Sequence, residues 1–475
     1  MSSPAFVTAE GTSSAHGQLN LRYIWTVSAV AALGGLLFGY DWVVIGGAKP
    51  FYEKFFQLTE PALQGWAVGC ALVGCLLGAI LSGSLSDRYG RKRLLLLAAF
   101  LFMVTSLGTA LAGSFKIFVA WRIMGGVAIG LASNLSPMYI AEVAPAGARG
   151  KLVSLNQLTI VIGILLAQLV NWLIAEHVPL EATAIDIMRS WNGQTGWRWM
   201  FGATAVPSLL FLLGMVFVPE SPRWLAKAGK REKARELLAR IGGAEYAAQA
   251  LDDIEATLRT EQKGLNLRDF SDSKLVKILF LGIVLAVYQQ WSGINVILVY
   301  ADEVFSAAGY KVSDILLNIV ITGAVNVAFT FVAIATVDRV GRRTLMLIGS
   351  AGLAITYTLL GVCYHIRSQG LHMLILAVMA IACFAMSLGP VIWVVISEIF
   401  PNRIRGAAMS IAVSSLWIAC FVLTYTFPLL NAALGPAKTF WIYAGICAAG
   451  FAFVHFRLPE TKGKTLEQIE TDLTR

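Results

Sequence analysis

The chain has 475 residues, of which 57% are hydrophobic and only 14% are charged. Soluble domains carry about a quarter charged residues, so this composition, with a mean hydropathy of +0.70, excludes an ordinary soluble globular protein. Lysine and arginine (37) exceed aspartate and glutamate (28) by nine, a surplus that basic cytoplasmic loops of a membrane protein explain without a nucleic acid partner.

Apolar runs long enough to cross a hydrocarbon layer of about 30 Å recur along the whole chain. We expect twelve, six on each side of a polar stretch, and each must be helical because lipid offers no partner to backbone N–H and C=O groups. They fall at 21–47, 62–84, 94–113, 118–139, 152–175, 198–218, 278–305, 313–336, 344–364, 372–399, 406–431 and 438–456. The pattern predicts an all-α polytopic membrane protein.

The polar segments divide the chain into five parts. Residues 1–20 lack the basic start and cleavage site of a secretory signal, so we expect a flexible cytoplasmic tail. Residues 219–277 are charged and carry apolar residues at helical spacing (234, 237, 238 and 241), which predicts a cytoplasmic linker of short amphipathic helices, with a regulatory role as the alternative. The bundles are then 21–218 and 278–456, followed by a tail at 457–475.

The distribution of cations predicts the orientation. If both termini lie inside, the short inner loops hold 11 lysines and arginines, the linker holds 12 more, and the longer outer loops hold 8. Cytoplasmic loops are enriched in these residues, so we expect both termini to be cytoplasmic.

The sequence offers no signature of a catalytic or metal centre. Its six cysteines lie in apolar segments without CxxC spacing, which indicates neither disulfides nor a metal site. Neither a zinc-binding HExxH pair nor a phosphate-binding GKS/T loop occurs, and the histidines lie at segment ends or in loops. We therefore expect no cofactor, no metal, no enzymatic activity and no ATP-driven transport.

Two loop motifs repeat between the halves of the chain. The sequence DRYGRK at 87–92 returns as DRVGRR at 338–343, 251 residues later (338 minus 87). A Glu-x6-Arg-Gly motif that starts at Glu142 returns at Glu398, 256 residues later (398 minus 142). Two motifs at nearly one period indicate a duplicated six-helix unit. Two such halves around a pseudo-two-fold axis form a known transporter architecture, with the substrate site between them near the membrane midplane.

The repeated motifs place carboxylates and guanidinium groups at the inner helix ends, where bidentate pairs can join neighbouring helices. We expect these pairs to hold the inner side closed when the cavity faces outward and to break when it opens inward. The residues assigned to this inner gate are Asp87, Arg88, Arg91, Glu142, Arg149, Asp338, Arg339, Arg342, Glu398 and Arg405.

Together with PESPRWL at 219–225 and PETKG at 459–463, these motifs resemble the sugar porter family of the major facilitator superfamily over roughly residues 21–470. The sequences GYD at 39–41, AMS at 385–387 and GP at 389–390 are most similar to those of its bacterial proton-coupled xylose permeases. The resemblance implies the major facilitator fold, with two pseudo-symmetric six-helix bundles, and transport of a monosaccharide. It also adds Glu220 and Arg223 to the inner gate.

Two ionisable residues lie inside predicted spans, Asp41 in the first and Arg122 in the fourth. Buried charges of this kind cost several kcal/mol and are functional candidates, so we expect them to pair. The aspartate can then bind a proton and release it when the arginine pairs again. The resemblance supports symport, because proton symporters of the family carry aspartate at this position and passive uniporters commonly carry asparagine. A static ion pair, or an aspartate reaching interfacial water, is the alternative.

Buried amides indicate the substrate site: Gln157 in the fifth segment and Gln289, Gln290 and Asn295 in the seventh. Amides donate and accept hydrogen bonds without charge, which suits a neutral polyhydroxylated ligand. Gln290 and Asn295 differ by about 140° around an ideal helix, so local unwinding at Gly293 is expected to bring both to the cavity. Interhelical hydrogen bonds are the alternative role. The resemblance maps family sugar contacts onto these four amides and Trp393.

Aromatic residues complete the predicted site. Phe384 and Trp393 flank a break expected at Gly389-Pro390, where they offer an apolar face to a sugar ring and a hinge for closure. Gln168 and Trp417 are further lining candidates. Leu416 replaces an amide of the xylose permease type and Val299 replaces one of two tyrosines, so the resemblance does not give the identity of the sugar.

Three functions remain open at this stage. The first is a proton-coupled importer of a hexose or pentose, working as a monomer in a bacterial inner membrane. The second is a passive sugar facilitator on the same scaffold. The third, a transporter-like sensor or an intramembrane enzyme, lacks support from the motifs and from the short carboxy-terminal tail.

Overall fold

The structure is a computed structural model that describes residues 19–145, 147–179, 181–261, 273–400, 405–462 and 468. The first half holds five long helices followed by two shorter ones that continue a sixth span. These are α1 (Leu21–Phe55), α2 (Pro61–Tyr89), α3 (Arg91–Ala110), α4 (Phe115–Val143), α5 (Arg149–Ile174), α7 (Trp197–Gly202) and α8 (Ala205–Phe217), with the loop helix α6 (Ala184–Arg189) and a π-helical turn (Asn192–Gly196) between α5 and α7.

The second half repeats the plan with more breaks. It comprises α11 (Ser273–Trp291), α12 (Ile294–Val299), α13 (Ala301–Ala307), α14 (Val312–Val340), α15 (Arg342–His365), α16 (Leu371–Ala385), α17 (Leu388–Ile399) and α18 (Arg405–Arg457). Between the halves lie α9 (Pro222–Lys227) and α10 (Arg231–Glu261), and α10 is two helices broken at Gly243.

Within the described residues, eleven helical runs are long and apolar enough to cross a membrane. The last of them, Ala407–Arg457, has 51 residues, whereas one crossing needs about 20. Its backbone leaves helical geometry at Gly435, where φ is 77°, so this run contains two spans. The prediction of an all-α polytopic protein is therefore confirmed.

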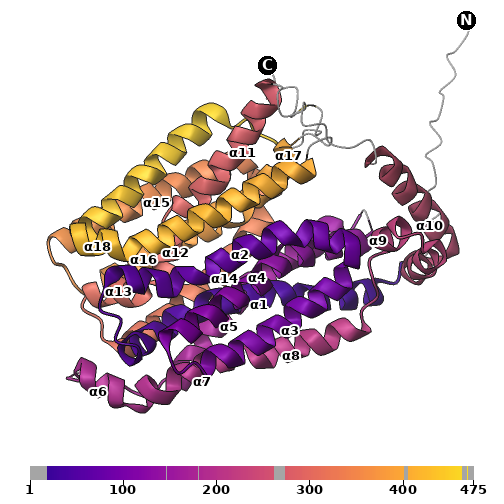
Figure 1. Cartoon of the computed structure of the whole chain (residues 1–475). Helices are drawn as coiled ribbons and strands as arrows, with labels where there is room; N and C mark the ends of the chain where they lie inside the picture. Colours follow the sequence, from indigo (N-terminus) through magenta and orange to yellow (C-terminus); the bar gives the residue numbers. More distant parts are fainter. Residues whose placement is uncertain are drawn as a thin grey trace, which may run out of the picture.

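The two halves lie side by side (Figure 1), the first drawn in indigo to magenta and the second in orange to yellow. Helices α9 and α10 lie at one end of the bundle, which we call the linker end, and α6 and α13 lie at the opposite, far end. The backbone N–H of Asn20, just before α1, donates to the carbonyl of Ile241 on α10 at 2.8 Å, so the chain begins its first span at the linker end.

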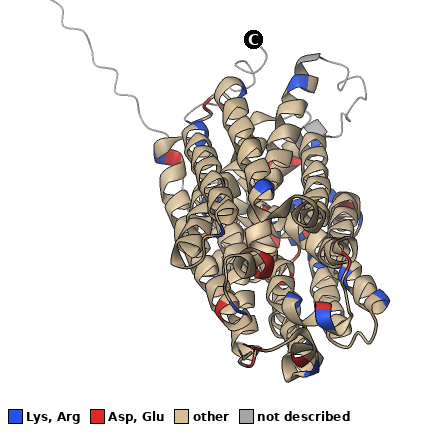
Figure 2. Cartoon of the chain, turned by 90° about the vertical axis from the view of Figure 1, so that its left-hand side faces the viewer, with Lys and Arg blue, Asp and Glu red and all other residues tan. Residues whose placement is uncertain are grey.

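The lateral surface is apolar. Figure 2 shows long stretches of helix without charged residues. Large apolar side chains point outward, with Phe217 86% exposed and Phe456 79% exposed. Such side chains are stable in contact with lipid, which fits the membrane assignment.

Three differences from the sequence prediction bear on the candidate site. The first span continues past residue 47 to Phe55, because the charged side chains of Lys49 and Glu53 are paired inside the protein. The predicted segment 278–305 is three helices, α11 to α13. The break in the tenth span lies at Met386–Ser387, two residues before the predicted Gly389-Pro390. Pro390 falls in the first turn of α17, where a missing N–H costs no intrahelical bond.

Candidate functional site

The two ionisable residues predicted inside spans lie against each other in the first bundle. Arg122 Nη1 on α4 donates to both carboxylate oxygens of Asp41 on α1, each at 3.1 Å, and Arg122 Nη2 donates to the Asp41 carbonyl at 3.3 Å. Asp41 is 4% exposed and Arg122 is 1% exposed. Two opposite charges buried away from water lose their hydration, and only close, hydrogen-bonded pairing of this kind compensates for that loss.

The pair is enclosed by elements of its own half. The Arg122 guanidinium lies 5.4 Å from the ring centre of Phe201 on α7. On α4, a Cβ built at Gly125 falls 3.7 Å from Asp41 Oδ2 and 3.2 Å from the hydroxyl of Thr105 on α3. Gly125 thus keeps this wall of the carboxylate free of side chain. Arg122 Nε has no hydrogen-bond partner, so the guanidinium has donor capacity that Asp41 does not use.

The predicted amides of the seventh span form a connected chain. Asn295 Nδ2 on α12 donates to Gln290 Oε1 at 2.6 Å, and Gln290 Nε2 donates to Gln289 Oε1 at 3.4 Å. Gln289 Nε2 donates in turn to the carbonyls of Leu388 and Gly389 on α17, both at 3.0 Å. These hydrogen-bonded amides fix α11, α12 and α17 relative to one another. They still leave acceptor and donor positions for a ligand.

The local unwinding predicted at Gly293 is confirmed. Helix α11 ends at Trp291, Gly293 adopts φ 84° and ψ 0°, and α12 starts at Ile294. This left-handed conformation strains any residue with a Cβ. The break is what allows Asn295 to reach back to Gln290 across a rotation that a continuous helix would not permit.

Two predicted residues face the boundary between the halves with unused hydrogen-bonding groups. Gln168 on α5 is 1% exposed, neither of its amide atoms has a partner, and its Oε1 lies where a Cβ of Gly323 on α14 would be. Trp417 on α18 packs its ring 5.7 Å from Phe38 on α1, and its buried Nε1 has no partner. Buried polar groups are normally satisfied, so these are positions where a polar ligand would gain hydrogen bonds.

The remaining predicted lining residues are half-buried. Gln157 lies on α5, while Phe384 on α16 and Trp393 on α17 lie on either side of the break at Met386–Ser387. The break is held by the hydroxyl of Ser387, which donates to the Cys383 carbonyl. The tenth span is therefore interrupted between the two aromatic side chains.

At the linker end of the first half, the buried side chain of Arg91 is the centre of a charged network. Its guanidinium contacts Asp87 Oδ1 at 3.0 Å and Glu142 Oε1 at 3.1 Å. Glu220 Oε1 accepts from the backbone N–H groups of Arg91 and Lys92, at 3.0 and 3.1 Å. A carboxylate at the start of α3 satisfies free N–H groups and favours the positive end of the helix dipole.

The second half repeats this network. Arg342 contacts Asp338 at 2.9 Å and Glu398 at 3.1 Å. Glu460 accepts from the backbone N–H groups of Arg342 and Arg343, at 2.9 and 3.1 Å. The sequence assignment did not include Glu460 in the gate, although the recurrence of PES at 219–221 as PET at 459–461 was a usable signal.

The other predicted gate residues differ in their exposure. Arg88, Arg149 and Arg339 are exposed, Arg223 is half-buried on α9, and the side chain of Arg405 lies outside the described residues. The pairs of Arg91 and of Arg342 each connect helices of a single half. Sequence analysis also missed Lys227, whose Nζ contacts Asp87 Oδ2 at 2.8 Å.

Contacts between the halves occur at the far end. Lys49 Nζ on α1 lies 3.1 Å from Asp302 Oδ2 on α13, and the Val178 N–H donates to the Ser313 hydroxyl at 3.1 Å. The rings of Trp66 on α2 and Phe421 on α18 meet edge to face, 6.2 Å apart. The far end is therefore closed in this structure.

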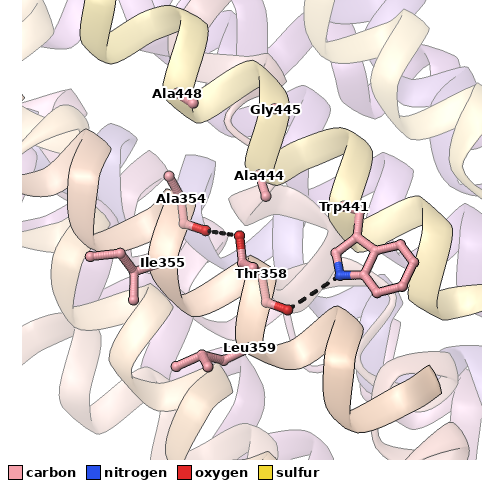
Figure 3. Close-up of a pocket in the computed structure, with 8 residues that line it drawn as sticks. All are labelled: Ala354, Ile355, Thr358, Leu359, Trp441, Ala444, Gly445 and Ala448. Atoms are coloured by element: carbon pink, nitrogen blue, oxygen red, sulfur yellow. Dashed lines mark hydrogen bonds between the residues drawn. The ribbon is translucent and has the colours of Figure 1, made fainter. Parts of the chain in front are cut away.

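A separate groove of about 530 Å³ lies between α15 and α18 (Figure 3). Small and apolar residues line it, and the Trp441 indole donates to the Thr358 carbonyl at 3.3 Å. The predicted sugar-binding residues are not among those lining it. Its apolar wall suits lipid chains better than a polyhydroxylated molecule.

Comparison with known families matches the model of the sugar (and other) transporters over residues 27–473. The D-xylose-proton symporter of Escherichia coli K12 is 42% identical, with 95% of this chain and 96% of that protein aligned. The arabinose-proton symporter of Bacillus subtilis is 40% identical, with 95% of each chain aligned. The galactose-proton symporter of Escherichia coli K12 is 37% identical over 97% of this chain and 96% of its own.

Solved structures agree with this similarity. The xylose transporter XylE from Escherichia coli in an inward-open conformation superimposes with a TM-score of 0.82 at 40% identity, covering 94% of this chain and 99% of XylE. XylE bound to 6-bromo-6-deoxy-D-glucose, described as a major facilitator superfamily proton:xylose symporter, gives a TM-score of 0.79 over 96% of this chain and 100% of its own.

Proposed function

The chain belongs to the family of sugar (and other) transporters, and from this premise we propose that it imports a monosaccharide, a hexose or a pentose, together with a proton by alternating access. The observation that carries the proton coupling is the buried pair of Asp41 and Arg122. Relatives named as proton symporters for xylose, arabinose and galactose support the same assignment.

In the proposed cycle, Asp41 takes up a proton when the cavity opens to the outside and the pair with Arg122 is broken. Protonation removes the negative charge of Asp41. Burying the neutral carboxyl when the far end closes then costs less free energy than burying the carboxylate. When the cavity opens inward, Arg122 pairs with Asp41 again and drives the proton off. The direction of sugar movement follows the proton gradient because the transition to the inward-open state requires both the sugar and the proton, whereas the return to the outward-open state requires that both have left.

The sugar site in this proposal lies between the halves. Gln168 and Trp417 supply unused polar groups there, and the chain of Gln289, Gln290 and Asn295 supplies donors and acceptors from broken helices. Amides without charge favour a neutral ligand. Phe384, Trp393 and Gln157 complete the proposed lining.

The linker end is proposed to be cytoplasmic, with both termini inside, as the distribution of lysine and arginine indicates. The far end, closed here by contacts between the halves, is then the outer side. In the opposite state, the charged residues around Arg91 and Arg342 are proposed to form pairs between the halves and so to close the linker end. We further propose a bacterial inner membrane as the location and a monomer as the functional unit.

Reconstituted proteoliposomes test the assignment. Uptake of glucose, galactose, xylose and arabinose is measured with an imposed proton gradient, with and without a protonophore, while external pH is followed. We expect one of these sugars to accumulate and the external medium to become more alkaline with it. Sugar uptake that equilibrates without proton movement would instead identify a passive facilitator, the second candidate on the same scaffold.

A further inference from the structure

A group of charged side chains at the far end has no role in the proposed proton or sugar sites. Lys49 on α1 is 1% exposed. Among the described residues, it is the only lysine whose ammonium directly contacts the three carboxylates of this group. Its Nζ lies 3.2 Å from Glu53 Oε1 and 3.1 Å from Asp302 Oδ2, and it also contacts Glu303 Oε1. We call these four residues the Lys49 cluster.

The cluster joins the two halves of the molecule. Lys49 and Glu53 belong to α1 in the first half, whereas Asp302 and Glu303 belong to α13 in the second. Lys49 lies eight residues beyond Asp41 on the same helix, about 12 Å farther toward the far end at 1.5 Å per residue. It is therefore separate from the Asp41–Arg122 pair and stands where the proposed outer entrance closes.

Neighbouring groups do not replace Lys49. The ammonium of Lys54 donates to the Pro50 carbonyl of its own helix at 2.9 Å. The Tyr300 ring centre lies 5.4 Å from Lys49 Nζ, and the Tyr300 hydroxyl donates to the Thr424 carbonyl at 2.6 Å. The cluster thus holds three carboxylates around one buried cation.

The carboxylates depend on that cation. Asp302 Oδ1 and Glu303 Oε2 are buried and have no hydrogen-bond partner. Without Lys49, carboxylates from both halves would face one another unpaired, and like charges in a poorly solvated site repel strongly. The same contacts that close the far end would then favour its opening.

Resting on the proposed alternating access, we propose that the Lys49 cluster is an electrostatic latch of the outer gate. Lys49 holds α13 of the second half against α1 of the first when the far end is closed. The latch breaks each time the transporter opens outward, so its strength sets the balance between the two states.

The test uses spin labels at the far end and requires neither sugar nor a proton gradient. Cysteines replace the exposed Thr59 in the first half and the exposed Ser306 on α13, in a chain whose six native cysteines are substituted. Pulsed electron–electron double resonance in lipid nanodiscs measures the distance between the two labels and so reports the fraction of molecules with the far end open. Retained sugar binding shows that the cysteine-free chain is folded.

The informative variant is Asp302→Asn combined with Glu303→Gln. It leaves Lys49 paired with Glu53 on its own helix, so the first half keeps its charge balance while the link to the second half is lost. We expect the equilibrium constant for opening at the far end to rise about tenfold or more. Lys49→Met is expected to shift it further, because it also leaves carboxylates unpaired. Lys54→Met, which removes a nearby cation that makes no direct contact with the second half among the described residues, is the matched control and should shift the distances much less.

The outcomes separate the latch from the proposed function. Unchanged distances in the Asp302→Asn/Glu303→Gln variant, with folded protein, would overturn the latch even if uptake proves to be proton-coupled. An equal shift with Lys54→Met would also overturn it, because net charge and not the contact would be responsible. If the distances shift as expected but wild-type uptake proves passive, the latch stands and only the proposed proton coupling fails.

Discussion

Arg122 reaches Asp41 with one nitrogen at 3.1 Å from each carboxylate oxygen, across 81 residues of sequence. With both side chains almost fully buried, each charge is compensated mainly by the other. Removing one partner of such a pair typically costs about 3–5 kcal/mol. We therefore expect the breaking and re-forming of this pair to serve the proposed transport cycle.

The first prediction concerns the proton. Asp41→Asn keeps the size and the hydrogen-bonding oxygen but cannot bind and release a proton, so we expect accumulation against a gradient to be abolished while sugar exchange across the membrane persists. Active uptake and counterflow in proteoliposomes measure the two activities. Asp314→Asn, a carboxylate exposed at the start of α14, is the control and should accumulate sugar normally. Accumulation by Asp41→Asn would contradict the proposed coupling.

The second prediction concerns the arginine. Arg122→Met leaves the carboxylate of Asp41 buried without a cation, so we expect a lower thermal unfolding temperature and loss of accumulation. Adding Asp41→Asn should restore stability, because the buried charge is then gone, but it should not restore accumulation. Thermal unfolding of the two variants in detergent gives the comparison. If the double variant is as unstable as the single one, Arg122 acts through packing and not through the pair.

Much of the architecture was predictable because membrane constraints act on composition. The twelve spans follow from apolar length, and the contact between residues as distant as Asp41 and Arg122 follows from the cost of an unpaired charge. The break at Gly293 followed from the angular conflict between Gln290 and Asn295. Each of these predictions rests on a physical rule that can be applied to the sequence without knowing the tertiary contacts.

Other features depended on tertiary contacts that no local rule reveals. Lys49 looked like a loop cation after the first span, and only its partners on α13 show that α1 continues through it. Arg88 and Arg91 belong to the same motif. Arg91, at the start of α3, points into the network, whereas Arg88, near the end of α2, is exposed to solvent. The roles of the predicted gate and sugar residues stay predictions.

The third prediction concerns the amide chain. Asn295→Ala removes the donor to Gln290 and a proposed sugar contact, so we expect the KM for the transported sugar to rise about tenfold, at about 1–1.5 kcal/mol for a lost hydrogen bond. Proton-driven uptake at saturating sugar should change less. Gln194→Ala, an exposed amide at the far end that bonds only to a local carbonyl, should leave the KM unchanged. An unaltered KM in Asn295→Ala would remove Asn295 from the sugar site.

The fourth prediction separates two arginines of one motif. Arg91 is 6% exposed and contacts Asp87 and Glu142. Asp87 keeps its pair with Lys227, so Arg91→Met should leave the buried carboxylate of Glu142 without its cation and lower stability by about 3 kcal/mol. Arg88 is exposed beside the Tyr89 ring, and Arg88→Met should cost less than about 1 kcal/mol. Thermal unfolding compares them. If the two variants lose equal stability, the motif acts through surface charge and not through the contacts of Arg91.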